Sequence, residues 1–169
     1  MQLRLAQTGD LPKIKEVYAR IVHHMQKNGL EIWDEVYPCE FFAADIENGS
    51  LYIAEDSQGN FIGAFALCKE NSGQSHIEWD ASGAKALYLD RFGINPDFLN
   101  KGFGSALLVY AGAQAKRKGA DYLRLFVVDG NKPAINLYRK NGFEQAEGVY
   151  QEKIEEDFVL CEYGYEKRI

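Results

Sequence analysis

Apolar and polar residues follow two different periods along this chain, and the period changes more than once. Between Leu11 and Met25 the apolar residues recur every three or four positions, which is typical of one face of an α-helix. From Leu51 the apolar residues are nearly continuous, and "LYIAED", the turn "SQGN" and "FIGAFALCK" predict a β-hairpin. Helical spacing returns at residues 102–118, after the strand candidate "KALYLDRFGIN" at 85–95. The pattern predicts a protein that contains both helices and strands.

The remaining segments complete a mixed arrangement. They are an opening strand at 3–6, a helix at 40–48, a strand at 76–79, a buried strand at 122–128, a short helix at 132–140, and closing strands at about 143–150 and 158–166 around the polar turn "QEKIEED". The order is β-α-α-β-β-β-β-α-β-α-β-β. One parallel crossover joins the strands at 85–95 and 122–128 through the helix at 102–118. This order predicts an α/β (α+β) mixed sheet. Because no linker or repeat interrupts the 169 residues, one domain spanning 1–169 is expected.

Charge and cysteine content narrow the classes of function. Acidic residues outnumber basic residues by 25 to 19, and the absence of a basic cluster argues against nucleic-acid binding. Cys39, Cys68 and Cys161 lie far apart without the spacing of metal ligands, so no metal site is expected. No stretch approaches the ~20 apolar residues of a membrane span. A soluble cytoplasmic protein without a nucleic-acid or membrane partner is expected.

The segment "NPDFLNKGFG", residues 95–104, places two glycines between a strand and a helix. The first backbone amides of a helix have no partners within it and lie at its positive end, so this order can bind an anion. A P-loop is absent, and the dinucleotide fingerprint GxGxxG fails because Leu107 occupies the third glycine position. Asp129 could imitate the acid that grips a ribose, but the segment between strand and glycine is longer than that fingerprint allows. Phosphate binding and close helix–sheet packing both remain open on these residues alone.

Two segments together resemble the signature of the GNAT N-acetyltransferase superfamily. They are "FGINPDFLNKGFGSALL" and "DGNKPAINLYRKNGF", the second spanning 129–143. The order of elements is similar to that family's fold over nearly the whole chain, and it implies a V-shaped splay between the strands at 85–95 and 122–128. One departure is Leu99, where the family has Arg or Gln. Because the loop binds through backbone amides, the resemblance still implies binding, with Lys101 supplying a nearby positive charge.

The resemblance implies acetyl-CoA as the co-substrate, with no metal. The pyrophosphate would contact the backbone of Leu99, Asn100, Lys101, Gly102, Phe103, Gly104 and Ser105. The pantetheine arm would pair with Phe92 and Ile94 as an added strand does, and Gly93 between them would allow a bulge or a close approach. Asn131 would contact the coenzyme where the second strand ends. A plain helix N-cap is the alternative for Asn131.

Tyr138 and Asp90 are the candidates for catalysis. A phenol of pKa ~10 is a suitable proton donor to a departing thiolate, although Tyr138 also fits a core aromatic at helical spacing with Ala134. The attacking amine must lose a proton, and Asp90 on the central strand is placed to take it. Glu78 is a second choice for that base. Pairing of Asp90 with Arg91 or a surface lysine is the alternative.

The loop "GLEIWDEVYP" at 29–38 is where related enzymes often build the acceptor site. Glu31 and Asp34 could favour a cation, and Trp33 and Tyr37 offer flat apolar surface or a cation–π contact. A solvated acidic face and ordinary core packing are the alternatives. The sequence thus predicts an enzyme that moves the acetyl group of acetyl-CoA to a primary amine of a small molecule or peptide by direct attack in a ternary complex. A non-catalytic coenzyme A-binding module is the alternative, dehydrogenase chemistry is disfavoured, and the resemblance is compatible with a homodimer.

Overall fold

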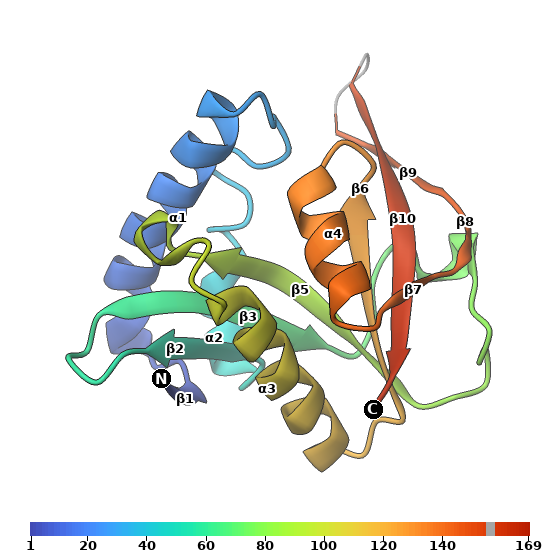
Figure 1. The fold of residues 1–169 in the computed structure, drawn as a ribbon, viewed down its shortest axis with the longest axis horizontal. Coiled ribbons are helices and arrows are strands. Elements are labelled where there is room, and N and C mark those ends of the chain that lie inside the picture. Colours follow the sequence, from blue (N-terminus) through green and yellow to red (C-terminus); the bar gives the residue numbers. More distant parts are fainter. Residues whose placement is uncertain (155–157) are drawn as a thin grey trace. The chain divides into compact units, whose positions relative to one another are not determined.

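The computed structural model describes residues 1–154 and 158–169. The chain forms two compact units, each described here by itself. The first unit contains residues 1–67 and 91–110, and the second contains 68–90 and 111–169. The strand β5 (Ala86–Ile94) and the helix α3 (Phe103–Arg117) each begin in one unit and end in the other (Figure 1). The single domain expected from the sequence stays a prediction.

The first unit is built on three antiparallel strands. β1 (Gln2–Leu5) pairs with β2 (Leu51–Glu55), and β2 pairs with β3 (Phe61–Cys68). Two α-helices join the strands: α1 (Leu11–Lys27), which follows the 3₁₀ turn η1 (Thr8–Asp10), and α2 (Phe42–Glu47). The end of β5 and the 3₁₀ turn η3 (Pro96–Phe98) complete this unit together with the beginning of α3.

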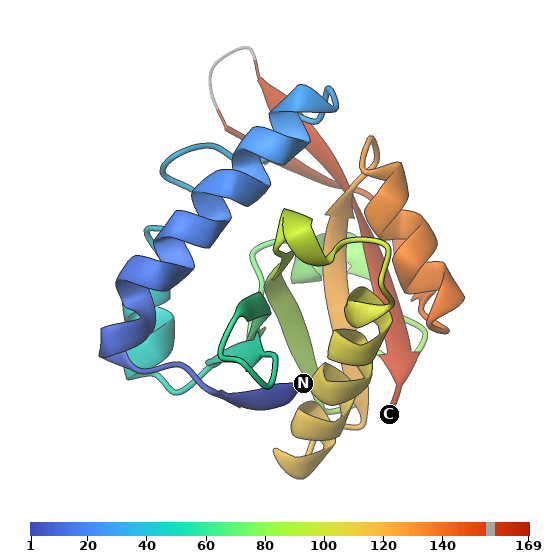
Figure 2. The ribbon, with the colours of Figure 1, turned by 60° about the vertical axis from the view of Figure 1, so that its left-hand side comes forward.

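The helix α1 forms where the sequence predicted it, because its apolar residues fall on one stripe. Ile14, Val17, Tyr18, Ile21 and Val22 are buried, and the polar residues between them face solvent. Pro12 lies in the first turn, where its missing amide donor costs nothing, and Gly29 follows the helix with a positive φ of 73°. The helix is seen along its whole length in Figure 2.

The second unit places a helix along a strongly twisted set of strands. Its elements are β4 (Ile77–Glu78), β6 (Tyr122–Val128), α4 (Lys132–Lys140), β7 (Glu144–Gln145), β8 (Glu147–Gly148), β9 (Tyr150–Lys153) and β10 (Val159–Arg168), with the 3₁₀ turn η2 (Gln74–His76). β10 pairs antiparallel with β6, β7 and β9, and β4 pairs with β8. The helix α4 lies along β10 in both views (Figures 1 and 2).

The parallel crossover predicted from the sequence is present. Residues 86–88 of β5 pair in parallel with residues 122–124 of β6. A mixed α/β fold is therefore confirmed. The splay of the two strands beyond these residues stays a prediction. None of the described helices is both long and apolar enough to cross a membrane.

The sequence was wrong about the first of the two closing strands, whereas the second, expected at about 158–166, forms as β10. The strand expected at 143–150 is divided into the two-residue strands β7 and β8, with Ala146 between them donating its amide to the carbonyl of Gly164. The expected turn "QEKIEED" begins as the strand β9, whose residues 150–153 pair with 159–162. Residues 155–157 of that turn lie outside the described residues. Gly148 explains the break in part, because its φ of 105° suits glycine and a Cβ there would collide with the backbone of His76.

Candidate active site

The loop that follows β5 is held by the side chain of Asn95. Its Nδ2 donates to the carbonyl of Phe61 at 2.8 Å, and its Oδ1 accepts the amide of Asp97 at 3.2 Å. Its own backbone amide donates to the carbonyl of Ile62 at 2.8 Å. Asn95 is buried, so these bonds fix the point at which the chain leaves the strand. The start of the glycine-containing segment is therefore rigidly attached to β3.

The segment then turns sharply into α3. Asn100 and Gly102 both have positive φ values, 59° and 82°. The amide of Ala106 donates to the carbonyl of Gly102 at 3.1 Å, which makes Gly102 the residue that caps the helix. The amides of Phe103 and Gly104 precede this first helical bond and lie at the positive end of the helix. A Cβ on Gly102 would meet no atom within 4 Å, so the space beside it is open.

Leu99 and Lys101 are already engaged within this loop. The amide of Leu99 donates to the carbonyl of Pro96 at 3.3 Å, and the ammonium of Lys101 donates to the carbonyl of Asp97 at 2.8 Å. The carboxylate of Asp97 in turn pairs with Arg20 from α1 at 2.7 Å. Two cationic side chains, those of Lys101 and Arg20, therefore lie at the loop. Residues 100–102 of the loop are exposed to solvent.

Gly93 was expected to allow a bulge or a close approach, and the structure shows a close approach of side chains. Its close neighbour is a side chain, because a Cβ there would lie 2.9 Å from the hydroxyl oxygen of Tyr18 and 3.0 Å from the Cδ1 of Ile21. The unusual backbone conformation lies two residues earlier, at Arg91, with a φ of 53°. For a non-glycine residue this conformation costs about 1–3 kcal/mol and persists only where the surroundings hold it. The irregularity that was expected at Gly93 is therefore found at Arg91, and Phe92, Gly93 and Ile94 follow it in extended structure.

Three contacts hold Arg91 in place. Its guanidinium pairs with the carboxylate of Asp45 on α2, with the Nε and Oδ2 atoms 2.7 Å apart and side chains only 8% and 10% exposed. The guanidinium also lies over the ring of Phe41, 5.3 Å from its centroid. The hydroxyl of Tyr18 donates to the backbone carbonyl of Arg91 at 2.5 Å. Burial raises the pKa of Tyr18 well above its ordinary value, so this phenol stays protonated and keeps donating.

The loop proposed for the acceptor carries a row of aromatic rings. Trp33 stacks on the buried Tyr18 with ring centroids 5.8 Å apart, and Tyr37 meets Trp33 edge to face at 6.1 Å. The carboxylate of Asp34 accepts the amides of Val36 and Tyr37, each at 2.7 Å, so it shapes the loop itself. Glu31 is exposed. The four predicted residues thus share one loop, but Asp34 is committed to local backbone and Trp33 packs partly on the core.

Tyr138 occupies the buried side of α4. It is 7% exposed, and its ring meets that of Phe143 edge to face at 5.9 Å. Burial raises the pKa of this phenol above its ordinary value, and the negative charge of Asp90 raises it further. The two residues that the sequence nominated for proton transfer are therefore close enough to influence each other electrostatically.

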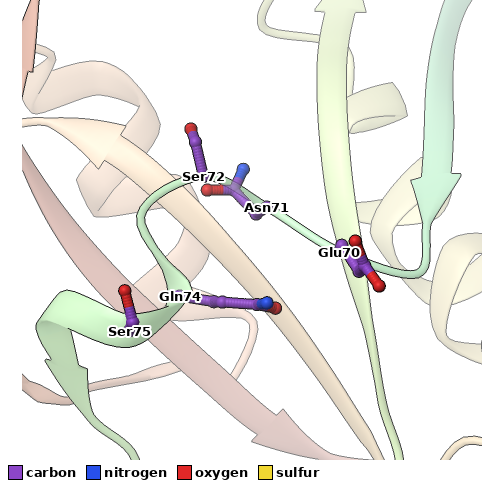
Figure 3. A pocket seen from close by; sticks show the side chains of 5 residues that line it. All are labelled: Glu70, Asn71, Ser72, Gln74 and Ser75. Atoms are coloured by element: carbon purple, nitrogen blue, oxygen red, sulfur yellow. The ribbon is translucent and has the colours of Figure 1, made fainter.

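Asp90 is hydrogen-bonded to the segment between β3 and η2. The Nδ2 of Asn71 donates to the Oδ1 of Asp90 at 3.2 Å. Asn71 belongs to a polar pocket on this segment, lined by Glu70, Asn71, Ser72, Gln74 and Ser75 (Figure 3). The structure adds two contacts that the sequence did not predict, an ion pair of Arg91 with Asp45 and an amide donor for Asp90.

Two further carboxylates join Asp90. Glu152 lies opposite Leu160 and Glu162 lies opposite Tyr150, so the two acids are diagonal neighbours on one face of the β9–β10 ladder. Burial raises the pKa of Glu162 to about 7, with the charges of Glu152 and Asp90 adding to the effect. Burial and the charge of Asp90 also raise the pKa of Glu152. These three side chains form the carboxylate group of the second unit.

The sequence reasoning missed Glu152 and Glu162. In the structure, Leu160, Gly164 and Glu166 are buried on the same register as Glu162, although Tyr165 on the other register is buried as well. The burial of Glu166 is explained by its ion pair with Arg124 at 3.0 Å. The charged groups that act on Glu162, in contrast, are the acids Glu152 and Asp90. Glu152 fell inside a segment that was expected to be a turn.

Asn131 and Glu78, the remaining candidates, show no contact within the described part of the chain that indicates a catalytic role. Asn131 accepts the amide of Ala134 at 3.2 Å, so it is the N-cap of α4, and its contact with a coenzyme stays a prediction. Glu78 lies exposed on β4 opposite Glu147, so it is poorly suited to be a base tuned by burial. Among the described residues, no group of three or more His, Cys, Asp or Glu is arranged to hold a metal ion.

Comparison with known proteins identifies the family to which this chain belongs. Residues 16–143 match the model of the Acetyltransferase (GNAT) family. The YwnH protein of Bacillus subtilis (strain 168), named provisionally as a phosphinothricin acetyltransferase, is 30% identical over 146 residues, which cover 86% of this chain and 85% of YwnH.

Solved structures agree on the fold. A GNAT-family acetyltransferase from Streptococcus agalactiae superposes with a TM-score of 0.80 at 19% identity, covering 99% of this chain and 95% of its own. The YncA protein of Salmonella typhimurium, provisionally named an acetyltransferase and solved with its cofactor acetyl-CoA, gives a TM-score of 0.69 at 19% identity and covers 99% and 93%. The match over most of the chain identifies this protein as a member of the GNAT family of acetyltransferases.

Proposed function

We propose that this protein transfers the acetyl group of acetyl-CoA to a primary amine of a small molecule or peptide, by direct attack in a ternary complex. The observation that carries the proposal is the carboxylate group of the second unit, in which Glu162 has a pKa of about 7. An amine is protonated at neutral pH, and removing a proton from an ammonium of pKa ~10.4 costs about 4–5 kcal/mol at pH 7. A base whose pKa lies near the working pH is the most effective acceptor for that proton.

The loop between β5 and α3 fits the coenzyme. Its open backbone at Gly102 and the amides of Phe103 and Gly104 at the helix start suit a pyrophosphate, which is an anion that binds through backbone donors. Lys101 and Arg20 add positive charge at the same loop. Acetyl-CoA supplies an activated thioester, and every other task falls to the protein.

Glu162 and Asp90 would take the proton of the amine, directly or through one water. The charge of Asp90 raises the proton affinity of both glutamates, and Glu152 raises that of Glu162, so a proton delivered to the group would be partly shared with Glu162 as its main acceptor. Asp90 was nominated from the sequence, and Glu162 is the addition that the structure supports. The negative charge of the group also favours a cationic acceptor before its proton is lost.

Tyr138 would return a proton to the departing thiolate. Its raised pKa keeps it protonated, but a raised pKa also makes it a weaker acid. The charge of Asp90 contributes to that rise, so any share of the amine's proton that reaches Asp90 would make Tyr138 more acidic at the moment when the thiolate needs a proton. Base and acid are coupled in this way through a single carboxylate.

The aromatic residues of the loop at 29–38 bear on the class of acceptor. Trp33 and Tyr37 would provide flat surface for the acceptor's carbon skeleton. The provisional name of YwnH supports a small amine such as phosphinothricin as the first compound to test. Polyamines, amino acids and peptides complete the panel.

The test is the release of free thiol from acetyl-CoA across that panel, with wild-type protein and Tyr138→Phe. We expect turnover with at least one amine, and a rate at least tenfold lower for Tyr138→Phe with nearly unchanged coenzyme affinity. Coenzyme binding without turnover on any acceptor would favour a non-catalytic coenzyme A-binding module. An unaltered rate in Tyr138→Phe would remove Tyr138 as the acid.

A further inference from the structure

The side chain of Asn71 is held in one orientation between two partners. Its Oδ1 accepts the backbone amide of Gly73 at 2.9 Å, and its Nδ2 donates to Asp90 at 3.2 Å. A backbone N–H can only donate, so the oxygen of the Asn71 amide must face Gly73. The NH₂ group must then face Asp90, and the arrangement allows no flip of the amide.

The segment that carries Asn71 is itself fixed by packing. A Cβ on Gly73 would lie 2.6 Å from the ring of Phe126 and 2.8 Å from the ring of Tyr150, so only glycine lets the backbone rest on these rings. The carbonyl of Gln74 accepts the indole N–H of Trp79 at 3.0 Å, and the amide of Gln74 donates to the carbonyl of Asn71 at 3.1 Å. Asn71 therefore presents its donor from a rigid support.

The charges that act with Asp90 explain why such a donor matters. The carboxyls of Glu152 and Glu162, on β9 and β10, and the phenol of Tyr138, on α4, all respond to the charge of Asp90. The charge of Asp90 disfavours ionisation of both glutamates, and each hydrogen bond from a neutral donor favours the ionised form of its acceptor. The donor of Asn71 is directed at Asp90.

We propose that Asn71 is a positioning residue, which keeps negative charge on Asp90 and leaves Glu162 as the member of the carboxylate group that exchanges the proton. This inference rests on the proposed function for its consequence in catalysis, but the placement of the charge can be measured without any activity. It also gives a role to Asn71 among the residues that line the polar pocket of Figure 3, since its side chain is hydrogen-bonded to Asp90 of the strand β5.

The experiment is a titration of the side-chain carboxyl groups by ¹³C NMR, on wild-type protein, Asn71→Ala and Asn71→Asp, with Asp90→Asn to assign the signal of Asp90. Asn71→Asp keeps an oxygen for the Gly73 amide, so the loop retains its support even where Asn71→Ala loosens it. The exposed Ser72→Ala in the same loop is the matched control. We expect the titration of Asp90 to move upward by about one pH unit in Asn71→Ala and by more in Asn71→Asp, and to stay in place in Ser72→Ala.

The pH profile of kcat/KM is the second readout. If the proposed function holds, the acidic limb of the profile moves upward with the titration of Asp90 in both Asn71 variants. A merely structural role would lower activity or stability without moving either curve, and unchanged titration of Asp90 in both variants would overturn the inference. Absence of turnover on every acceptor would defeat the proposed function alone, because the NMR titration would still decide the role of Asn71.

Discussion

Two carboxylates that the fold withdraws from water differ in the charge of their neighbours. Asp45, in the first unit, lies 2.7 Å from the guanidinium of Arg91. Glu162, in the second unit, has Glu152 and Asp90 as the charged groups that act on it, and its pKa rises to about 7. Burial alone therefore does not decide what an acid does. The cation beside Asp45 makes it a support, and the acids beside Glu162 make it a group that exchanges protons near neutral pH.

The same contrast extends to the two units. The first unit contributes backbone features to the proposed coenzyme site, namely the turn at Gly102, the amides at the start of α3 and the strained residue Arg91. Its ion pair and rings hold that backbone in place. The second unit instead contributes titratable side chains, Asp90 and Tyr138 among them. The first unit should thus respond to mutations through stability and coenzyme affinity, and the second through pH dependence and rate.

Asp45→Ala should show the largest effect on stability. Removal of one partner leaves the guanidinium of Arg91 buried without its carboxylate, which typically costs about 3–5 kcal/mol. The free energy of unfolding, measured by urea denaturation at pH 7, should fall by that amount. Asp97→Ala is the control, since Asp97 pairs with Arg20 on the surface at 63% exposure and should cost at most about 1 kcal/mol. Equal losses in the two variants would contradict the supporting role of Asp45.

Glu162→Gln should act in the opposite direction on stability. The pKa of Glu162 rises from 4.5 in the unfolded chain to about 7 in the fold, so the folded state binds the proton more tightly. The contribution of Glu162 to stability is therefore fully present below pH 4.5 and is lost as the pH rises through 7. Replacing it with a neutral residue should stabilise the protein at pH 8 by about 2 kcal/mol and change little at pH 4.

The same variant should lose activity. Removal of a general base typically lowers the rate by about a hundredfold, so Glu162→Gln should be more stable and less active at pH 8. Glu166→Gln, on the same strand and face, is the matched control. Glu166 pairs with Arg124, so this change should lower stability. Loss of stability in both variants, measured by thermal unfolding at pH 8, would refute the comparison.

The sequence could predict the part of the site that depends on local backbone chemistry. Glycine at 102 with an apolar-periodic segment behind it is a local signal for a helix start, and the structure has that start. Tyr138 on α4 and Asp90 on β5 are likewise found on the elements that were predicted. These features could be predicted because a turn or a helix face is determined by a few consecutive residues.

The rest depends on contacts between distant residues. Glu162 is a diagonal neighbour of Glu152 only because β9 and β10 pair, and most of β9 was expected to be a turn since "QEKIEED" is polar except for Ile154. The pairing of Arg91 with Asp45 joins residues 46 positions apart. The carboxylate of Asp34 accepts two amides of its own loop, a contact that its residue type did not reveal, and its contact with a substrate stays a prediction. A side chain's partner cannot be inferred from its type when several partners of the right charge exist in the chain.

The smallest effect should come from Gly102→Ala, and it tests whether the first unit works through its backbone. Gly102 has a φ of 82°, where alanine costs about 1 kcal/mol, and Gly59, in the hairpin turn between β2 and β3, has the same φ and also has open space around it. The two alanine variants should therefore lose equal stability, about 1 kcal/mol each. Only Gly102→Ala should weaken coenzyme A binding, by about tenfold in calorimetry, because its methyl group occupies the open space beside the amides that start α3. If Gly59→Ala weakens binding as much, the loss reflects strain in the fold, and the loop at 99–105 is not where the pyrophosphate binds.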